Sequence, residues 1–131
     1  MSQEYCTPTK SVFVVDEDEN QRRSLGLILQ RAGYKVVTVG RACEALELLR
    51  TSDCNLIILD ISTPENRLTL LPAVLCTYPQ LSILVFTANW SPETAQEIEL
   101  LGVKAHLEKP VTPKSLLERV DIILKENPDP T

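Results

Sequence analysis

The stretch Leu56-Ile57-Ile58-Leu59-Asp60 decides the fold, because four bulky apolar residues in a row are closed by a carboxylate. A strand that is apolar on both faces is typical of the middle of a parallel sheet, where helices cover it from both sides. Similar apolar runs occur at residues 12–15, which precede Asp16, and at residues 83–86, which precede Thr87. We therefore expect buried parallel strands that end in polar residues.

Segments with helical spacing separate these runs and complete five βα units, which is typical of an α/β fold. Two further strands are expected at residues 35–39 and 105–107. Helices are expected from Asn20, as the N-terminal cap, to Gly33, at 42–51, around 68–77, at 92–101 before Gly102, and from Thr112, as a cap, to Leu124. Pro72 fits the third helix only in its first turn or at a bend.

The length and composition predict one compact domain. The 131 residues are 44% hydrophobic, and we expect a core at about 11–125 with tails at 1–10 and 126–131. Acidic residues outnumber basic ones by 18 to 13, so a net charge of -5 disfavours direct nucleic-acid binding. No apolar stretch approaches the roughly 20 residues of a membrane span, and no signal-like segment begins the chain, so a cytoplasmic location is expected.

The four cysteines, Cys6, Cys43, Cys54 and Cys76, contain no C-x-x-C pair, and the single histidine is distant from them in sequence. A zinc site or a redox motif is therefore not expected. We interpret the cysteines as reduced thiols without a chemical role.

Polar residues at the carboxyl ends of the predicted strands form the candidate site, because ligands gather at that edge of a parallel sheet. They are the acidic run at 16–19, Asp60, Thr87, and the sequence Glu108-Lys109-Pro110. If the first and third strands are neighbours, about 4.8 Å apart, Asp16, Glu17 and Asp60 crowd together. Such a pocket requires Mg²⁺ or an ammonium group such as that of Lys109.

Each of these residues also has an ordinary structural explanation. The acidic run can be an exposed loop whose carboxylates interact favourably with the positive N-terminus of the first helix, and aspartate, as at Asp60, is common in turns. Thr87 is a β-branched strand residue, and Lys109 could be a solvated loop charge. Their occurrence together, on successive strand ends, favours a functional site.

In these residues the sequence resembles the receiver domains of bacterial two-component response regulators, from about Ser11 to Leu124. The resemblance rests on Val14-Val15-Asp16-Glu17-Asp18, on Leu56–Asp60 with Pro64 four residues later, on Val85-Phe86-Thr87-Ala88, and on Glu108-Lys109-Pro110. It implies a flavodoxin-like (βα)5 fold, with a doubly wound parallel five-stranded sheet of order 2-1-3-4-5 and helices on both faces.

The resemblance also implies a reaction. Asp60 would accept a phosphoryl group from a sensor histidine kinase, a phosphotransfer protein or a small phosphodonor. Mg²⁺ would be bound by Glu17, Asp60 and the backbone carbonyl of Ser62, with Asp16 acting through water. Lys109 would offset charge on the transferring oxygens.

A switch is implied as well, because the phosphoryl oxygens would attract the Thr87 hydroxyl and Lys109. In the family, the surface that changes is formed by the fourth helix, fifth strand and fifth helix, and it serves homodimerisation or partner docking. Here that surface would contain Trp90, Leu100, Lys104 and His106.

Three positions depart from the family pattern. Glu17 replaces the usual Asp, and the loop at 65–68 lacks the paired glycines and is one residue shorter. His106 replaces an aromatic residue, so it is either a half-exposed strand residue or an altered switch. Trp90 is either a partner anchor or lies across its own loop.

Two other functions are weighed. A degenerate receiver would act as a phosphorylation-independent interaction module, as Glu17 and the altered loop suggest. A phosphohydrolase acting on external substrates is disfavoured, because every connection is short and only Lys109 is basic near the site. We therefore expect a phosphoacceptor whose only chemistry is on its own Asp60, not an enzyme.

Overall fold

The computed structural model describes residues 9–103 and 105–126. Most of the two expected tails, together with Cys6 and Lys104, lies outside these ranges. The elements are β1 (Ser11–Val15), α1 (Glu19–Arg31), β2 (Lys35–Val39), α2 (Ala42–Thr51), β3 (Leu56–Asp60), η2 (Glu65–Leu70), α3 (Leu71–Thr77), β4 (Ser82–Thr87), α4 (Pro92–Leu100), β5 (Ala105–Glu108) and α5 (Pro113–Glu126).

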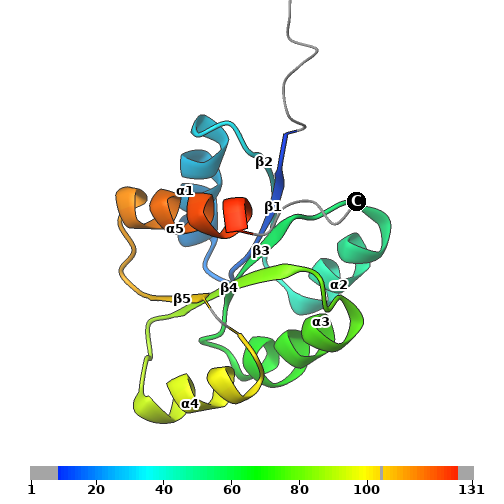
Figure 1. Ribbon diagram of the computed structural model, residues 1–131, viewed down its shortest axis with the longest axis vertical. Coiled ribbons are helices and arrows are strands. Elements are labelled where there is room, and N and C mark those ends of the chain that lie inside the picture. Colours follow the sequence, from blue (N-terminus) through cyan, green and yellow to red (C-terminus); the bar gives the residue numbers. More distant parts are fainter. Residues whose placement is uncertain (1–8, 104, 127–131) are drawn as a thin grey trace, which may run out of the picture.

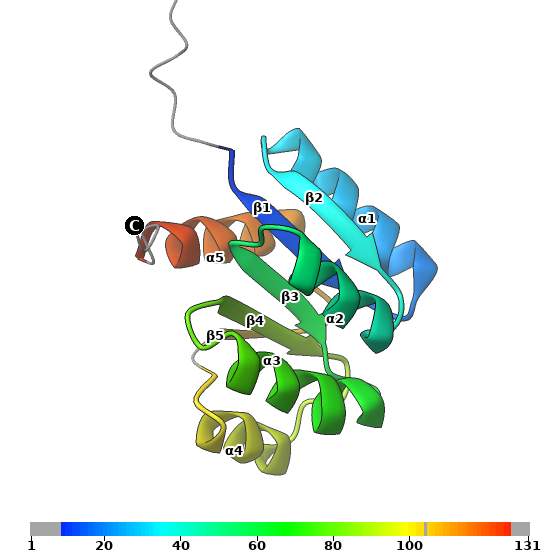
Figure 2. The ribbon, with the colours of Figure 1, turned by 90° about the vertical axis from the view of Figure 1, so that its right-hand side faces the viewer.

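All five strands run parallel, in the order β2-β1-β3-β4-β5. Helices α1 and α5 lie on one side of the sheet, and α2 and α3 lie on the other (Figures 1 and 2). This confirms the expected doubly wound fold and strand order. Because β1 and β3 are direct neighbours, their carboxyl ends lie side by side.

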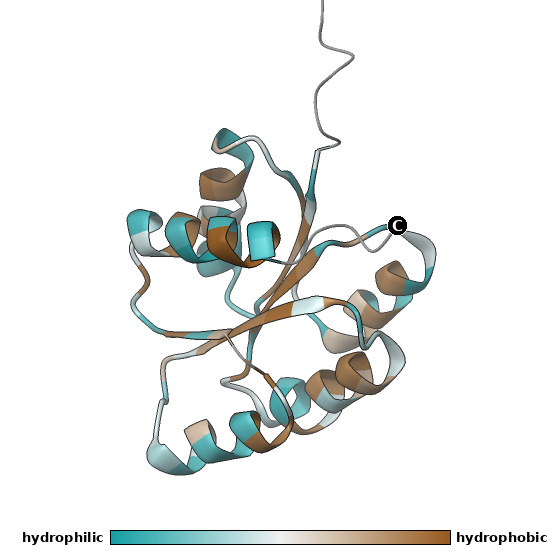
Figure 3. Cartoon of the chain, viewed as in Figure 1, coloured by the Kyte–Doolittle hydropathy of each residue, from teal (hydrophilic) through white to brown (hydrophobic). Residues whose placement is uncertain are grey.

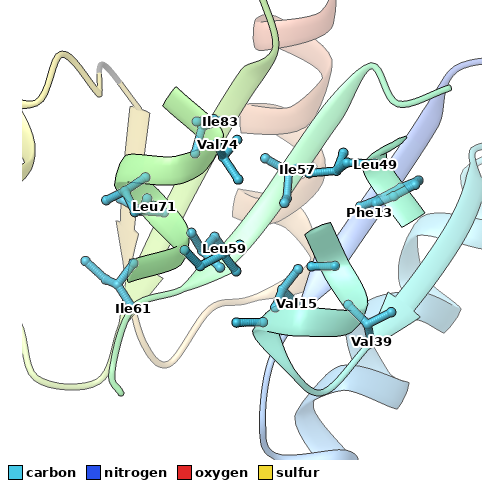
Figure 4. Packing of buried hydrophobic residues seen from close by; sticks show 14 of the residues in the cluster. Phe13, Val15, Val39, Leu49, Ile57, Leu59, Ile61, Leu71, Val74 and Ile83 are labelled. Carbon is cyan, nitrogen blue, oxygen red and sulfur yellow. The ribbon is translucent and has the colours of Figure 1, made fainter. Parts of the chain in front are cut away.

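The core has two layers on opposite faces of the sheet, and β3 contributes to both. Ile57 and Leu59 lie in the layer under α2 and α3, whereas Leu56 and Ile58 lie in the layer under α1 and α5. We call these the α2-side core, which also contains Phe13, Val15, Leu49, Leu71 and Val74 (Figure 4), and the α1-side core, which also contains Val12, Val14, Leu25, Leu29 and Val120.

The two-residue period of a strand explains why neighbouring residues of β3 alternate between the layers. Each of its four apolar side chains is completely buried, and each contributes roughly 1.5–3 kcal/mol through the apolar area it removes from water. Figure 3 shows the same distribution, with hydrophobic residues concentrated along the strands. This rigid centre positions Asp60 at its end.

Helix α1 begins at a different cap from the one expected. Asp18, in extended backbone conformation, is the N-cap, and its carboxylate accepts a hydrogen bond from the Gln21 amide at 3.0 Å. The expectation of Asn20 as the cap was wrong, because Asn20 lies inside the first turn. The helix ends at Arg31, and Gly33, two residues later, has a φ of +100° that favours glycine.

The third helical segment begins earlier than expected, at Glu65 and not near Leu68. Its first part, η2, is a π-helical stretch in which the Leu71 amide donates to the carbonyl of Asn66. The segment then continues as α3, with Pro72 in the first turn. A proline ring cannot donate a hydrogen bond and crowds the preceding turn, so a wide turn immediately before Pro72 is physically reasonable.

The remaining boundaries differ from expectation by one or two residues. Strands β1, β4 and β5 are slightly longer than expected, α4 ends at Leu100, and α5 continues to Glu126. Thr112 does cap α5, since its hydroxyl accepts from the Ser115 amide at 3.1 Å. In the described ranges, no helix is both long enough and apolar enough to cross a membrane.

Candidate functional site

Two buried carboxylates and one ammonium group meet at the carboxyl edge of the sheet. Asp60 is the last residue of β3, and Asp16 directly follows β1. The Lys109 Nζ atom lies 3.0 Å from Asp60 Oδ2 and 3.3 Å from Asp16 Oδ2. Because the two carboxylate side chains are only 7% and 0% exposed, these are partly desolvated ion pairs. Lys109 therefore bridges the two acids that the sequence places at neighbouring strand ends.

The backbone of Lys109 fixes the start of its side chain. Its amide donates to the Thr87 carbonyl at 3.1 Å, which continues the pairing of β4 with β5. The Nζ atom lies 4.7 Å from the centre of the Phe86 ring, within the range of a cation–π contact. The Lys109–Pro110 peptide bond is cis. The lysine is thus oriented by both β4 and β5.

Asp60 is held as an ionised carboxylate. Burial raises its pKa, but hydrogen bonds from Ser62 and the nearby Lys109 ammonium outweigh burial and leave the pKa below its ordinary value. The Ser62 amide donates to Asp60 Oδ1 at 2.9 Å. The side-chain amide of Asn66 donates to the Asp60 backbone carbonyl at 2.8 Å. The carboxylate is therefore both charged and restrained at neutral pH.

Asp16 shows the opposite electrostatic balance. Burial raises its pKa, and the negative charge of Asp60 adds to that effect. The amide of Asp18, which donates to Asp16 Oδ1 at 2.9 Å, and the Lys109 ammonium lower it only in part. The pKa of Asp16 is consequently raised. Asp16 and Asp60 share the single positive charge of Lys109, so the negative charge of Asp16 is only partly compensated.

Thr87 lies at the end of β4 with its hydroxyl near the same site. Its Oγ1 atom is 3.1 Å from Ser62 Oγ and accepts a hydrogen bond from the Asn89 amide at 3.0 Å. Ser62 Oγ also accepts from the Ala88 amide at 3.4 Å. The loops that follow β3 and β4 are therefore connected through the hydroxyls of Ser62 and Thr87.

Glu17 does not join the buried carboxylates. Its side chain is exposed, and no group of three or more His, Cys, Asp or Glu residues suited to a metal ion occurs among the described residues. Asp16 and Asp60 do offer the charged oxygen donors that Mg²⁺ prefers. The chemistry of this pair fits Mg²⁺, but Glu17 would have to turn inward to participate.

Sequence reasoning missed the side-chain roles of three polar residues: Ser62, Asn66 and Arg22. The Arg22 guanidinium donates to the Asp16 carbonyl at 2.8 Å and to the Glu17 carbonyl at 3.4 Å. Its position four residues after the true cap, Asp18, could have indicated that it lies over the acidic loop. No comparable sequence signal marks Ser62 or Asn66, since their contacts depend on the path of the loop.

His106 and Trp90 form a stacked pair. Their ring centroids are 4.4 Å apart, and the ring planes differ by 14°. Trp90 is partly buried against the α2-side core, whereas His106 is exposed on β5. Leu100, on α4, is 81% exposed. The tryptophan thus links the loop after β4 to β5.

The described cysteines differ in environment. Cys43 and Cys76 are exposed, Cys54 is partly buried, and all three are free thiols. Burial raises the pKa of the Cys54 thiol to about 12, despite hydrogen bonds to backbone groups that act in the opposite direction. A thiol with that pKa is protonated and unreactive at neutral pH.

Comparison with known proteins agrees with this geometry. The family model described as response regulator receiver domain matches residues 12–121. Protein PetR of Rhodobacter capsulatus is 39% identical over 121 residues, which cover 90% of this chain and 50% of that protein. The DNA-binding transcriptional regulator NtrC of a Bradyrhizobium species is 32% identical, over 91% of this chain and 25% of that protein. The chain thus spans half or less of the length of these relatives.

Solved structures show the same likeness. A CheY-like receiver domain protein from Methanospirillum hungatei superimposes with a TM-score of 0.86 at 29% identity, covering 92% of this chain and 97% of that one. The chemotaxis protein CheY4 of Vibrio cholerae gives 0.83 at 31% identity, with coverages of 89% and 100%. With its sheet order, its bridged carboxylates and a family match over most of its length, the chain belongs to the response regulator receiver domains of two-component systems.

Proposed function

We propose that Asp60 accepts a phosphoryl group from a phosphohistidine of a sensor kinase or phosphotransfer protein. The observation that favours this most is the ionised, restrained Asp60 carboxylate next to the Lys109 ammonium, 3.0 Å away. An Asp60 oxygen attacks phosphorus, the P–N bond breaks, and the released imidazole takes up a proton. The product is an aspartyl phosphate.

The surrounding residues have distinct tasks in this reaction. Lys109, which is paired with the Asp60 carboxylate, offsets the negative charge that develops on the equatorial phosphoryl oxygens. The Ser62 amide holds Asp60 Oδ1, which leaves Oδ2, the oxygen paired with Lys109, to act as nucleophile. Bound Mg²⁺ would supply further charge neutralisation. Asp60, the Ser62 carbonyl and an inward-turned Glu17 would be its protein ligands, and Asp16 would act through water.

Phosphodonor labelling tests the proposal directly. The protein is incubated with MgCl2 and phosphoramidate, and its intact mass is measured over time. We expect one added phosphoryl group, none when EDTA replaces MgCl2, and none in Asp60→Asn. Asp53→Asn, at an exposed aspartate, is the matched control and is expected to be labelled like the parent protein.

Three results would contradict this function. An unlabelled but folded parent protein would favour the alternative, a phosphorylation-independent interaction module. Labelling that persists in Asp60→Asn would place the acceptor elsewhere. Sustained release of phosphate from an added phosphomonoester would point to hydrolysis of external substrates.

Phosphorylation would act on the rest of the molecule through Thr87. Its hydroxyl is now 3.1 Å from Ser62 Oγ, and new phosphoryl oxygens would compete for it. Movement of Thr87 would pull on the loop that holds Trp90, which is stacked on His106 of β5. We therefore assign the surface of α4, β5 and α5, with the exposed Leu100, to homodimerisation or partner docking.

Tryptophan fluorescence can follow this switch, because Trp90 is the single tryptophan of the chain. Phosphoramidate with MgCl2 should change the Trp90 emission in the parent protein, and Thr87→Ala should abolish the change while Asp60 is still labelled. An equal emission change in Thr87→Ala would remove Thr87 from the route.

The partner classes follow from the same assignment. Receiver domains interact with histidine kinases or phosphotransfer proteins, and we place this chain with such a partner in the cytoplasm. The net charge of -5 argues against a direct grip on nucleic acid by these 131 residues. DNA binding appears in the name of one longer relative, NtrC of a Bradyrhizobium species, and this chain covers only 25% of the length of that protein.

A further inference from the structure

The Arg22 side chain contacts the acidic loop, residues 16–18, at the backbone carbonyls of that loop and not at its carboxylates. From the first turns of α1, its Nη1 atom donates to the Asp16 carbonyl at 2.8 Å and to the Glu17 carbonyl at 3.4 Å. The residue is partly buried, and it forms no ion pair with any residue that the structure describes. A cation that follows an acidic stretch of sequence but binds its backbone carbonyls is placed to fix a peptide plane, since a carbonyl accepts in a defined direction.

Gly40 provides the space for this contact. A Cβ atom at Gly40 would lie 2.7 Å from Arg22 Nη1, closer than real Cβ contacts, and 3.3 Å from its Cζ, which is tight. Gly40 follows β2, whose last residue, Val39, accepts a hydrogen bond from the Asp16 amide at 3.1 Å. The end of β2, the loop after β1 and the start of α1 therefore meet at the guanidinium.

The acidic loop has few other restraints beyond Asp16. Asp18 is anchored by its amide to Asp16 Oδ1 and by its side chain to α1. Glu17 lies between these anchors with an exposed side chain. Of the contacts described, only Arg22 reaches the Glu17 backbone. A longer acid in place of the usual aspartate must approach the site from a well-defined backbone position.

We infer that Arg22, seated against Gly40, is a positioning residue that fixes the Asp16–Glu17 peptide and thereby sets the affinity of the acidic pocket for Mg²⁺. The inference rests on the proposed Mg²⁺ site. The proposed effect of Arg22 is geometric, and loss of Arg22 should therefore weaken Mg²⁺ binding. Its charge has the opposite effect, because removal of a nearby positive charge would by itself strengthen the binding of a cation. Variants can therefore separate positioning from electrostatics.

The test measures Mg²⁺ affinity by titrating ¹⁵N-labelled protein with MgCl2 and following backbone amide shifts. Arg22→Ala should raise the Kd by about tenfold, as is typical when an outer-shell partner of a metal site is lost. Gly40→Ala, which keeps every charge but displaces the guanidinium, should raise it similarly. Arg22→Lys, with one donor group, should be intermediate. Arg23→Ala, which removes the exposed neighbour paired with Glu19, should remain within about twofold.

Two further measurements complete the design. The double variant Arg22→Ala/Gly40→Ala should bind Mg²⁺ no more weakly than either single variant, because both remove one contact. In EDTA, amide exchange at residues 17 and 18 should be faster in Arg22→Ala and Gly40→Ala than in Arg23→Ala. Urea unfolding of each variant shows whether it is folded. If Arg22→Ala does not fold, Gly40→Ala alone tests the positioning role.

The outcomes are distinguishable. If the parent protein binds no Mg²⁺, the proposed metal site fails. If the parent binds Mg²⁺ but Gly40→Ala binds it equally well, or Arg22→Ala binds it more tightly, the positioning role is overturned. Additive losses in the double variant would also overturn it, since the two residues would then act independently.

Discussion

Asp16 and Asp60 lie at neighbouring strand ends and share Lys109, yet their pKa values shift in opposite directions. The difference comes from local hydrogen bonding. Asp60 receives hydrogen bonds from Ser62, whereas Asp16 is completely buried with less compensation. One carboxylate is thereby prepared as a nucleophile, and the other retains unfavourable free energy that a bound cation can relieve.

Asp16→Asn should therefore stabilise the Mg²⁺-free protein at pH 7. The folded-state pKa of Asp16 is raised, so the native state binds more protons than the unfolded state above the ordinary Asp pKa, and its stability falls as the pH rises through that interval. The gain in Asp16→Asn should consequently shrink as the pH is lowered toward about 4. Urea unfolding in EDTA measures both effects.

Asp53→Asn is the control for this prediction, since Asp53 is exposed and should change the free energy of unfolding by less than about 0.5 kcal/mol. MgCl2 should stabilise the parent protein more than Asp16→Asn, because the variant has lost a cation-binding charge. A destabilised Asp16→Asn at pH 7 would show that the Lys109 bridge outweighs the burial of the carboxylate.

The cysteines give a second prediction for single residues. With a pKa of about 12, Cys54 should resist iodoacetamide at pH 8, whereas the exposed Cys43 and Cys76 should be alkylated. Peptide mass spectrometry reads each site separately. In urea all three should be modified, and equal rates for Cys43 and Cys54 in the folded protein would contradict the burial argument.

Secondary-structure elements were predicted well where packing dictates them and less well where local geometry does. The apolar residues of β3 indicate a buried strand in any context, but the strand order came from the family resemblance. Asp18 and Asn20 are both good capping residues, and only the extended backbone at Asp18 distinguishes them. The early start at Glu65 likewise depends on how Asn66 packs under the site, which no periodicity encodes.

The same division holds for the candidate site. Asp16, Asp60, Thr87 and Lys109 were predictable because parallel strands bring their carboxyl ends to one edge. The outward position of Glu17 was not, since a loop side chain can turn either way. Arg22 was missed because its contact is to backbone carbonyls, and its spacing of four residues from Asp18 was the one signal of it in the sequence.

Capping provides a prediction for α1. Asp18→Ala should lower the free energy of unfolding by about 1 kcal/mol, because the Gln21 amide loses its acceptor. Asn20→Ala should be neutral or slightly stabilising, since Asn20 lies inside the helix, where alanine is the better helix former. Chemical unfolding of the two variants measures both free energies. A larger loss of unfolding free energy in Asn20→Ala than in Asp18→Ala would show that Asn20 is the cap.

Over the whole molecule, β3 joins two cores that otherwise lie on opposite faces of the sheet. Its residues are fully buried on both sides, so neither layer can lose its packing without exposing the strand. This arrangement predicts a single cooperative unfolding transition of the described domain.

Two conservative variants test that cooperativity. Ile57→Val, in the α2-side core, and Ile58→Val, in the α1-side core, should each cost about 1 kcal/mol. In both, urea unfolding monitored by Trp90 fluorescence should coincide with unfolding monitored by far-ultraviolet circular dichroism. If Ile58→Val shifted the dichroism transition alone, the layers would unfold independently.

The contrast between the central and outer strands of the sheet has a further consequence. β1, β3 and β4 are buried throughout, whereas β2 exposes Lys35 and Thr38, and the four-residue β5 exposes His106 and Glu108. The outer strands are those whose free backbone groups could pair with a second molecule. Charged side chains and a short β5 make such pairing unfavourable, so the domain is protected against growing into edge-to-edge fibres at high concentration.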